Sequence, residues 1–243
     1  MKKIDVHAHH GQWQFPMPVD DETQRLLRLC DREQIEHMVC SSALAIMYDM
    51  EAGNAEMVRA IEPHARLLGY VYINAAMLTE SIEQMERYLP LDFMVGAKVH
   101  PRLSGVACDA PAMAALIAEV AERAPVLLVH TVDQHAAHQL GDYAREYPQL
   151  SVILGHAGHT DSDEVARVAA AVPNVYIEFC CEWPGAGKIE RALEICGPEK
   201  VCFGSDSDLL DPAFTLGMYE GAGLSEIQRQ LIYWDNAARL FRL

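Results

Sequence analysis

Residues 126–156 read VLLVHTVDQHAAHQLGDYAREYPQLSVILGH, and this stretch shows the pattern that decides the fold. Two short apolar runs, at 126–129 and 151–154, have the length and composition of buried strands. Between them, residues 134–147 have the apolar spacing of an amphipathic helix. Outward in both directions, the chain continues this alternation of strand and helix.

Eight strands are predicted in all, at Lys3–Val6, His37–Ser41, Leu67–Ile73, Phe93–Val99, Val126–Val129, Ser151–Leu154, Val175–Phe179 and Val201–Phe203. Helices are predicted at Asp20–Gln34, Gly53–Ile61, Thr79–Leu89, Ala110–Arg123, Gln134–Tyr147, Ser162–Ala171 and Lys188–Cys196, with a terminal helical group from Leu224 to Phe241. Eight strand–helix pairs in 243 residues favour an α/β fold of the (β/α)₈ barrel type over a doubly wound open sheet. Because no proline- or glycine-rich linker divides the chain, we expect residues 1–243 to form a single domain.

The composition narrows the classes of function. The chain has 51% hydrophobic and 22% charged residues, which is typical of a soluble globular protein. Its formal net charge of −16 argues against binding to nucleic acid or to an anionic membrane, since both require a basic surface. No apolar run approaches the roughly 20 residues of a membrane helix, and no apolar signal-peptide core follows Met1. The seven cysteines include no C-x-x-C pair, so we expect no disulfide framework and a cytoplasmic location.

Polar residues follow several of the predicted strands. In Asp5-Val6-His7-Ala8-His9 the two histidines are spaced i, i+2 and therefore point to the same side of a strand. Taken singly, each polar residue would mark only the exit of a strand into solvent. In a barrel, however, the carboxyl ends of all strands open onto one face, where barrel enzymes hold their active sites. The residues that would meet there are His7, His9, His130, His156 and Asp206. Their convergence predicts a metal centre.

This arrangement resembles the amidohydrolase superfamily, whose members have H-x-H after the first strand, His after the fifth and sixth, and Asp after the eighth. Three further segments are similar to the amidohydrolase-related branch, which includes aminocarboxymuconate semialdehyde decarboxylase. They are Gly96-Ala97-Lys98-Val99-His100-Pro101, Gly204-Ser205-Asp206 and Asn236-Ala237-Ala238-Arg239-Leu240-Phe241. The resemblance covers essentially the whole chain.

The resemblance implies a divalent metal ion held by His7, His9 and His130, with Asp206 as a further ligand. Zinc is the expected ion, and manganese is an alternative. The implied reaction is hydrolysis of an amide, lactone or ester in a small molecule by a metal-activated water. Asp206 would take the proton of that water and pass it to the leaving group, and His156 would assist proton transfer or stabilise developing charge.

Lys98 allows three interpretations. In other branches a lysine at this position forms a carbamate that bridges two metals, and His130 and His156 would then both bind the second ion. We favour one metal per chain, as in the closer branch. Lys98 would then remain an ammonium that pairs with a substrate carboxylate, or it would pair with an acidic side chain inside the barrel. His100 and Arg102 are further candidates for substrate binding.

A second function is compatible with the same ligands: non-oxidative decarboxylation of a small carboxylated substrate, in which a proton replaces carbon dioxide. A cation that binds a second carboxylate near the metal would favour this reaction. A non-catalytic metal-binding protein is disfavoured because all five positions carry ligand-type residues. We expect a small-molecule substrate and a homo-oligomer, most simply a dimer.

Overall fold

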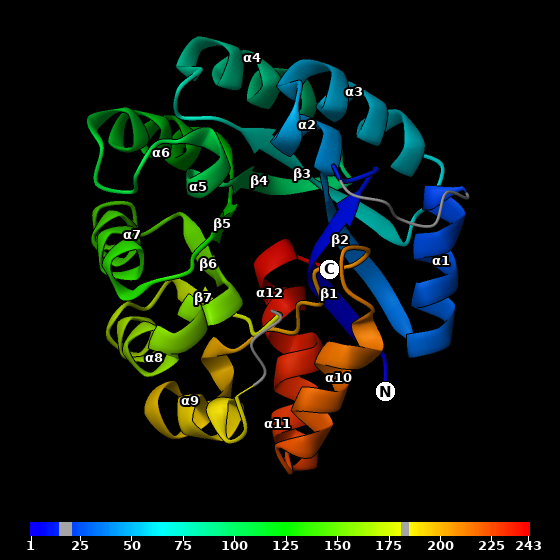
Figure 1. Ribbon diagram of the computed structural model, residues 1–243, viewed down its shortest axis with the longest axis vertical. Helices are drawn as coiled ribbons and strands as arrows, with labels where there is room; N and C mark the ends of the chain where they lie inside the picture. Colours follow the sequence, from blue (N-terminus) through cyan, green and yellow to red (C-terminus); the bar gives the residue numbers. More distant parts are fainter. Residues whose placement is uncertain (15–20, 181–184) are drawn as a thin grey trace.

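The computed structural model describes residues 1–14, 21–180 and 185–243. Seven parallel strands form one sheet in sequence order, each paired with the next. They are β1 (Lys3–His10), β2 (Ile35–Ser42), β3 (Leu67–Ile73), β4 (Met94–Val99), β5 (Val126–His130), β6 (Ser151–Gly155) and β7 (Val175–Ile177). The sheet curls, and the helices lie around its outer face (Figure 1). The predicted α/β fold with parallel strands is confirmed, whereas the closed (β/α)₈ barrel stays a prediction.

The predicted eighth strand is not a regular strand. Val201 forms a single parallel bridge with Ile177 at the end of β7, and Ser207 forms one with Ala8 in β1. Between them, the carbonyl of Phe203 accepts a hydrogen bond from the backbone N–H of Val6, at 2.9 Å. Residues 201–207 therefore lie between the last and first strands, but they contribute isolated bridges and not an eighth ladder. The prediction of eight strands is correct for seven.

Seven helices follow the seven strands, close to the predicted positions. They are α1 (Glu22–Glu33), α3 (Met50–Ile61), α4 (Leu78–Tyr88), α6 (Pro111–Arg123), α7 (Gln134–Glu146), α8 (Ser162–Ala171) and α9 (Lys188–Cys196). The predicted terminal group consists of α11 (Glu226–Gln230), η3 (Leu231–Asp235) and α12 (Asn236–Phe241). Further helical segments were not predicted: α2 (Ala43–Met47), α5 (Pro101–Ser104), η1 (His156–Asp161), η2 (Pro198–Lys200) and α10 (Pro212–Gly221). None of the described helices is both long and apolar enough to cross a membrane.

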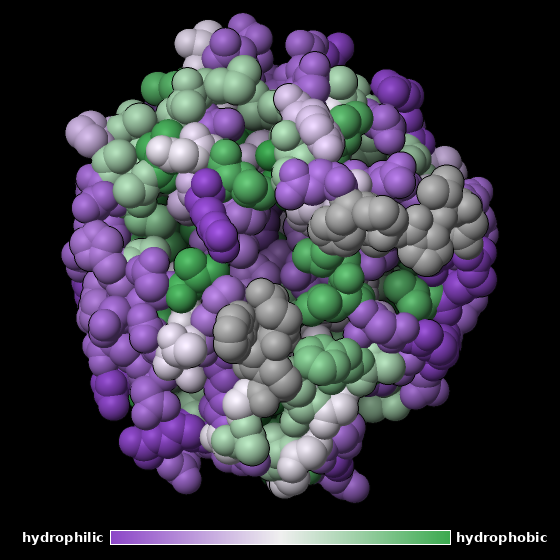
Figure 2. Space-filling view, in the orientation of Figure 1, coloured by the Kyte–Doolittle hydropathy of each residue, from purple (hydrophilic) through white to green (hydrophobic). Residues whose placement is uncertain are grey.

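The alternation of side chains along each strand produces two apolar cores. One core lies between the outer face of the sheet and the surrounding helices. The other fills the inside of the curled sheet, with residues from the early part of the strands such as Ile4, Leu68 and Val126, and it packs against Leu240 and Phe241 of α12. Because α12 covers the amino ends of the strands, the carboxyl ends remain for polar side chains. Figure 2 shows the molecule hollowed near its centre, with both hydrophilic and hydrophobic residues around the hollow.

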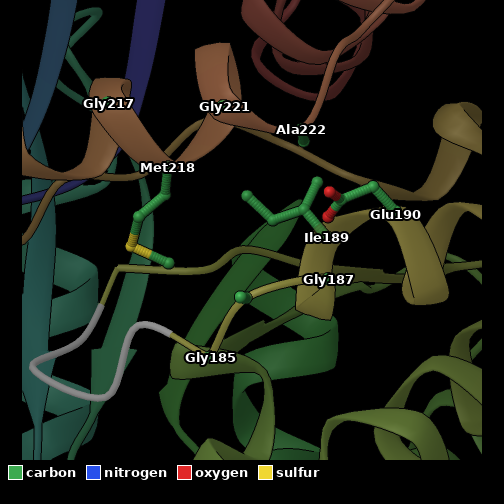
Figure 3. A pocket seen from close by; sticks show the side chains of 9 residues that line it. Gly185, Gly187, Ile189, Glu190, Gly217, Met218, Gly221 and Ala222 are labelled. Carbon is green, nitrogen blue, oxygen red and sulfur yellow. The ribbon is translucent and has the colours of Figure 1, made fainter.

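A cavity of about 240 Å³ lies between the start of α9 and α10, away from the strand ends (Figure 3). Gly185, Gly187, Gly217 and Gly221 line it, with Glu190 as the titratable residue among the lining residues.

A Cβ atom added at Gly217 would meet no atom within 4 Å. By contrast, a Cβ atom at Gly53 in α3 would lie 2.1 Å from the backbone nitrogen of Ala45.

We predict opposite effects of alanine at these two helical glycines. Gly217→Ala should raise the free energy of unfolding by up to about 1 kcal/mol, because alanine favours a helix interior over glycine. Gly53→Ala should lower it by about 1–3 kcal/mol or more, because the backbones of α2 and α3 must separate. Urea unfolding of both variants measures the difference. A destabilised Gly217→Ala variant would contradict the open space beside that residue.

Candidate metal centre

A cavity of about 170 Å³ opens at the carboxyl ends of the strands. All eight residues that the sequence singled out line it: His7, His9, Lys98, His100, Arg102, His130, His156 and Asp206. They come from β1, β4, β5 and the segments that follow β4, β6 and β7, so residues up to 199 positions apart in the sequence meet here. Trp13, His159 and Leu209 complete the lining.

The two histidines of β1 lie side by side, as the i, i+2 spacing predicts. β1 continues to His10, so both rings project from a strand rather than from a loop, although the register with β2 shifts between Asp5 and Ala8. The ring centroids of His7 and His9 are 5.2 Å apart, and both side chains are buried. Trp13 contacts His9 edge-on, with 4.8 Å between ring centroids. Phe15 and Trp183, two further aromatic residues that the sequence places on loops after predicted strands, lie outside the described residues.

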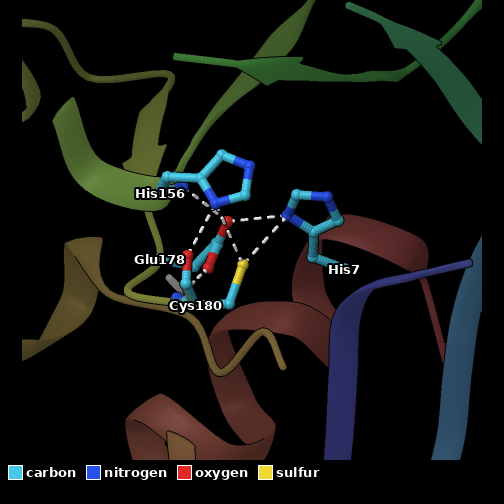
Figure 4. Close-up of side chains that lie close together, drawn as sticks. All are labelled: His7, His156, Glu178 and Cys180. Atoms are coloured by element: carbon cyan, nitrogen blue, oxygen red, sulfur yellow. Dashed lines mark hydrogen bonds and ion pairs between the residues drawn. The ribbon is translucent and has the colours of Figure 1, made fainter. Parts of the chain in front are cut away.

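Glu178 fixes the orientation of His7 (Figure 4). Its Oε1 atom lies 2.8 Å from Nδ1 of His7 and also accepts the backbone N–H of His156 at 2.8 Å. Its Oε2 atom accepts the backbone N–H of Cys180 at 2.6 Å. Burial lowers the pKa of His7 well below its ordinary value, so the ring is neutral. With Nδ1–H donated to Glu178, Nε2 of His7 carries the lone pair.

His9 and His156 are held in the same way. Nδ1 of His9 lies 3.0 Å from Oγ of Ser41, whose hydroxyl donates to the carbonyl of Ala8. Nδ1 of His156 donates to the backbone carbonyl of Cys180 at 2.6 Å. In these three rings, therefore, the Nδ1 atom binds the protein and the Nε2 atom remains for a metal or a substrate. This is the usual arrangement of histidines that bind metals.

Asp206 is attached to β1, although residues 201–203 form no ladder. Its backbone N–H donates to the carbonyl of His7 at 2.7 Å. The buried carboxylate of Asp5 accepts the backbone N–H of His7 at 3.1 Å and that of Ser205 at 3.0 Å. Asp206 and His156 both have positive φ, at 61° and 64°. Residues other than glycine rarely adopt this conformation, and where they do it is often at a functional site.

The carboxylate of Asp206 faces the two β1 histidines. Oδ1 of Asp206 lies 2.9 Å from Nε2 of His9 and 3.6 Å from Nε2 of His7. Burial alone would raise the pKa of Asp206, but a hydrogen bond from Nε2–H of His9 and the neighbouring imidazoles hold it below its ordinary value. When the proton of His9 lies on Nδ1 instead, the Nε2 lone pair and the carboxylate repel each other unless a cation lies between them. The donor set thus fits a divalent ion, because these three ligand atoms lie within 4.8 Å of one another.

Lys98 projects from β4 into the same cluster. Its buried Nζ atom lies 2.9 Å from Nε2 of His7. Burial lowers the pKa of this ammonium to about 8, although the nearby carboxylate of Asp206 opposes the effect. The amine uses the same lone pair of His7 that a metal would need. Lys98 and a metal ion therefore compete for His7.

His130 and His100 form one wall of the cavity. Their rings are stacked with centroids 3.7 Å apart, and burial lowers the pKa of both, that of His100 to about 2. Nε2 of His130 is buried and has no hydrogen-bond partner within the described residues. His130 is not part of the compact group formed by His7, His9 and Asp206, so its role as a ligand stays a prediction. Arg102 lies on α5 and is exposed.

Glu178 and Cys180 form a second compact group with His7 and His156, in which the ligand atoms also lie within 4.8 Å. The Nδ1 atoms of both histidines already form hydrogen bonds there, and burial raises the pKa of the Cys180 thiol well above its ordinary value. This group therefore acts as a hydrogen-bonded support behind the cavity. The carboxylate of Glu178 is bound by His7 and by two backbone N–H groups, and it supports the cavity without lining it.

The fold and the cavity define an α/β protein with a curled sheet of seven parallel strands, in which histidines and an aspartate gather at the carboxyl ends of the strands. The family model described as Amidohydrolase matches residues 4–243, and the chain therefore belongs to this family. No curated protein sequence matches the chain significantly.

Solved structures share the fold at low sequence identity. A dihydroxybenzoic acid decarboxylase from Polaromonas sp. JS666, with bound manganese and the inhibitor 2-nitroresorcinol, has a TM-score of 0.77 and 17% identity, covering 100% of this chain and 97% of that chain. A 2,6-dihydroxybenzoate decarboxylase from Rhizobium has a TM-score of 0.75 and 17% identity, and the match covers 99% of this chain and 98% of that chain. A protein described as a probable 2-pyrone-4,6-dicarboxylic acid hydrolase from Acinetobacter baumannii, with citric acid bound, has a TM-score of 0.72 and 17% identity, and the match covers 100% of both chains. The similar structures thus include decarboxylases and a hydrolase.

Proposed function

We propose that this protein is a metal-dependent hydrolase that cleaves an amide, lactone or ester bond in a small molecule. The observation that carries the proposal is the contact of the Asp206 carboxylate with Nε2 of His9 at 2.9 Å, beside Nε2 of His7 at 3.6 Å. This group combines a metal-binding set with a carboxylate that can also accept a proton.

His7, His9 and Asp206 would hold the ion, and His130 would contribute its unpartnered Nε2 atom. We propose one ion per chain, zinc in the first place and manganese as the alternative, since nitrogen and carboxylate ligands suit both. When bound, the ion would polarise the substrate and lower the pKa of a water molecule. Burial of the ligands excludes bulk water and strengthens these electrostatic effects.

The protein's own groups would move the proton. Asp206 accepts it from the attacking water and later delivers it to the leaving group. His156 donates Nδ1–H to Cys180, so its Nε2 atom is a base in the neutral ring. It donates a hydrogen bond to a substrate oxygen only after Nε2 has been protonated. We therefore assign His156 to proton transfer first and to stabilisation of negative charge second.

We also propose that residues 201–207 complete an eight-segment barrel by bridging β7 and β1, and that residues 1–243 form one domain. We also propose a cytoplasmic location, which the cysteine content supports, and a homodimer, the commonest state of soluble oligomers.

The test is the reaction in isotopically labelled water with a panel of lactones, amides and esters. Hydrolysis places one labelled oxygen in the acid product, which mass spectrometry detects. Turnover without incorporation of the label would contradict hydrolysis.

A second candidate function, decarboxylation, is favoured by one observation: Lys98 and Arg102 line the same cavity and are suited to bind a carboxylate. The same panel should then include hydroxylated benzoates. Release of carbon dioxide, together with one solvent deuterium in the product, would identify decarboxylation. If every carboxylated compound that is turned over releases no carbon dioxide and gains no deuterium, decarboxylation is excluded.

Of the three interpretations of Lys98, we propose the ammonium that binds a substrate carboxylate. Lys98→Met should then raise KM for a carboxylated substrate about ten- to a hundredfold, because a charge-assisted hydrogen bond is lost. Metal affinity should rise, since Nε2 of His7 no longer contacts an amine. Titration with a chelator and steady-state kinetics measure both effects, with Lys2→Met at an exposed position as the control. If the wild-type protein instead bound two ions per chain and Lys98→Met bound one, the result would support a carbamate on Lys98.

A further inference from the structure

We propose that the substrate carries an apolar extension beyond its reacting group, and that a second cavity next to the metal centre binds this extension. The inference rests on the proposed function for the identity of the reacting group. The second cavity has a volume of about 360 Å³ and lies between α5 with its following loop and the start of α7.

The two cavities share lining side chains and are therefore neighbours. Arg102 and His130 line both of them. His130 stacks on His100 on the side of the metal centre, so its ring separates the two spaces. A ligand that passes His130 therefore contacts Arg102 at the junction.

The lining of the second cavity is suited to an apolar group. Pro101, Ala107, Cys108, Val132 and Ala136 supply most of its side chains. The acidic and imidazole groups at its outer end already have partners. Asp133 accepts the backbone N–H of Ala136 as the cap of α7, and His135 lies 3.1 Å from Asp109.

Arg102 supplies the polar specificity. Within the described residues it forms no hydrogen bond or ion pair, so its guanidinium is available to a ligand at the junction. In a protein with a net charge of −16, this cation and Lys98 mark the cavity as a site for an anion. The chemical class that fits is a carboxylate with an apolar group attached.

The volumes give the size of that group. A cavity of about 150 Å³ holds one benzene ring. The catalytic cavity, at about 170 Å³, is large enough for one ring-sized reacting group. The second cavity, at about 360 Å³, has room for an extension of one to two further rings. A single-ring acid would leave it unused.

The experiment compares the binding of benzoate and 4-benzyloxybenzoate to the whole protein by calorimetry. The longer acid should bind at least tenfold more tightly. Ala136→Leu and Ala107→Leu fill the second cavity from opposite sides, and each should remove this gain while benzoate affinity stays the same. Ala107 is exposed on a loop, so its replacement leaves the fold intact. Ala52→Leu, at an exposed position of α3, is the matched control and should keep the gain.

Arg102→Gln should weaken the binding of both acids to a similar extent, because both present the same carboxylate. Equal affinity of the two acids for the unmodified protein would overturn the proposal, as would a gain that survives both filled variants. Binding requires no turnover, so a protein that fails every hydrolysis assay can still show the gain. Conversely, a protein that hydrolyses its substrate but binds 4-benzyloxybenzoate no more tightly than benzoate would refute the proposed apolar extension and leave the proposed function in place.

Discussion

Asp206→Asn is expected to reduce turnover by about a hundred- to ten-thousandfold, the range for loss of a group that transfers protons. The amide keeps the size of the side chain but neither accepts the proton nor carries the negative charge next to His9. The backbone contacts of Asp206 with β1 do not involve the carboxylate, so the fold should remain. Steady-state kinetics and thermal unfolding measure the two properties separately.

The matched control is Asp211→Asn, the same chemical change five positions along the chain. Asp211 is the exposed cap of α10, where it accepts the backbone N–H of Ala213 and pairs with Arg32. Its replacement should cost less than about 1 kcal/mol of stability, because asparagine is an equally good N-cap and the ion pair is exposed, and should leave turnover unchanged. Wild-type turnover in the Asp206→Asn protein would remove Asp206 from the mechanism.

Glu178→Gln should weaken metal binding about ten- to a hundredfold, although Glu178 is not among the residues that line the cavity. Glutamine has one acceptor oxygen, whereas Glu178 accepts from His7, from His156 and from Cys180. At least one buried donor then loses its partner, at a cost of about 1–3 kcal/mol. If that donor is His7, its ring is free to rotate or to change tautomer, and Nε2 no longer faces Asp206.

A purely structural role for Glu178 would lower stability and leave metal affinity unchanged. The chelator titration therefore distinguishes the two roles, and the exposed Glu51→Gln serves as control. Excess metal should restore part of the activity of Glu178→Gln, because the ligands themselves are still present. Unchanged metal affinity in a folded Glu178→Gln protein would show that this carboxylate does not position His7.

Strands with an uninterrupted apolar run could be predicted from the sequence, because burial on both faces leaves a clear pattern in β3, β5 and β6. The segment 201–203 has the same apolar character, yet residues 201–207 form isolated bridges instead of a ladder. A pattern of hydrophobicity indicates burial but not the completion of a ladder. α10 was missed although Asp211-Pro212 is a recognisable helix start, with an N-cap followed by proline.

The eight predicted residues that line the cavity could be found because they lie at or just after strand ends, whereas Trp13, His159 and Leu209, which lie further along the following segments, were not among them. The hydrogen bonds that orient the eight residues could not be found in this way. Glu178 and His7 are 171 positions apart, and Ser41 and His9 are 32 apart. Nothing in the local sequence identifies which buried carboxylate faces which ring. A lone glutamate in the apolar run 175–179 was the available signal, since a buried charge requires a partner.

Elemental analysis of the protein purified without chelator, alongside the double variant His7→Ala/His9→Ala, tests the central claim most directly. We predict one divalent ion per chain in the wild type and loss of that ion in the folded double variant, because two of the nitrogen ligands are removed. A wild-type protein that takes up no ion even after reconstitution, or a double variant with full occupancy, would contradict the metal centre.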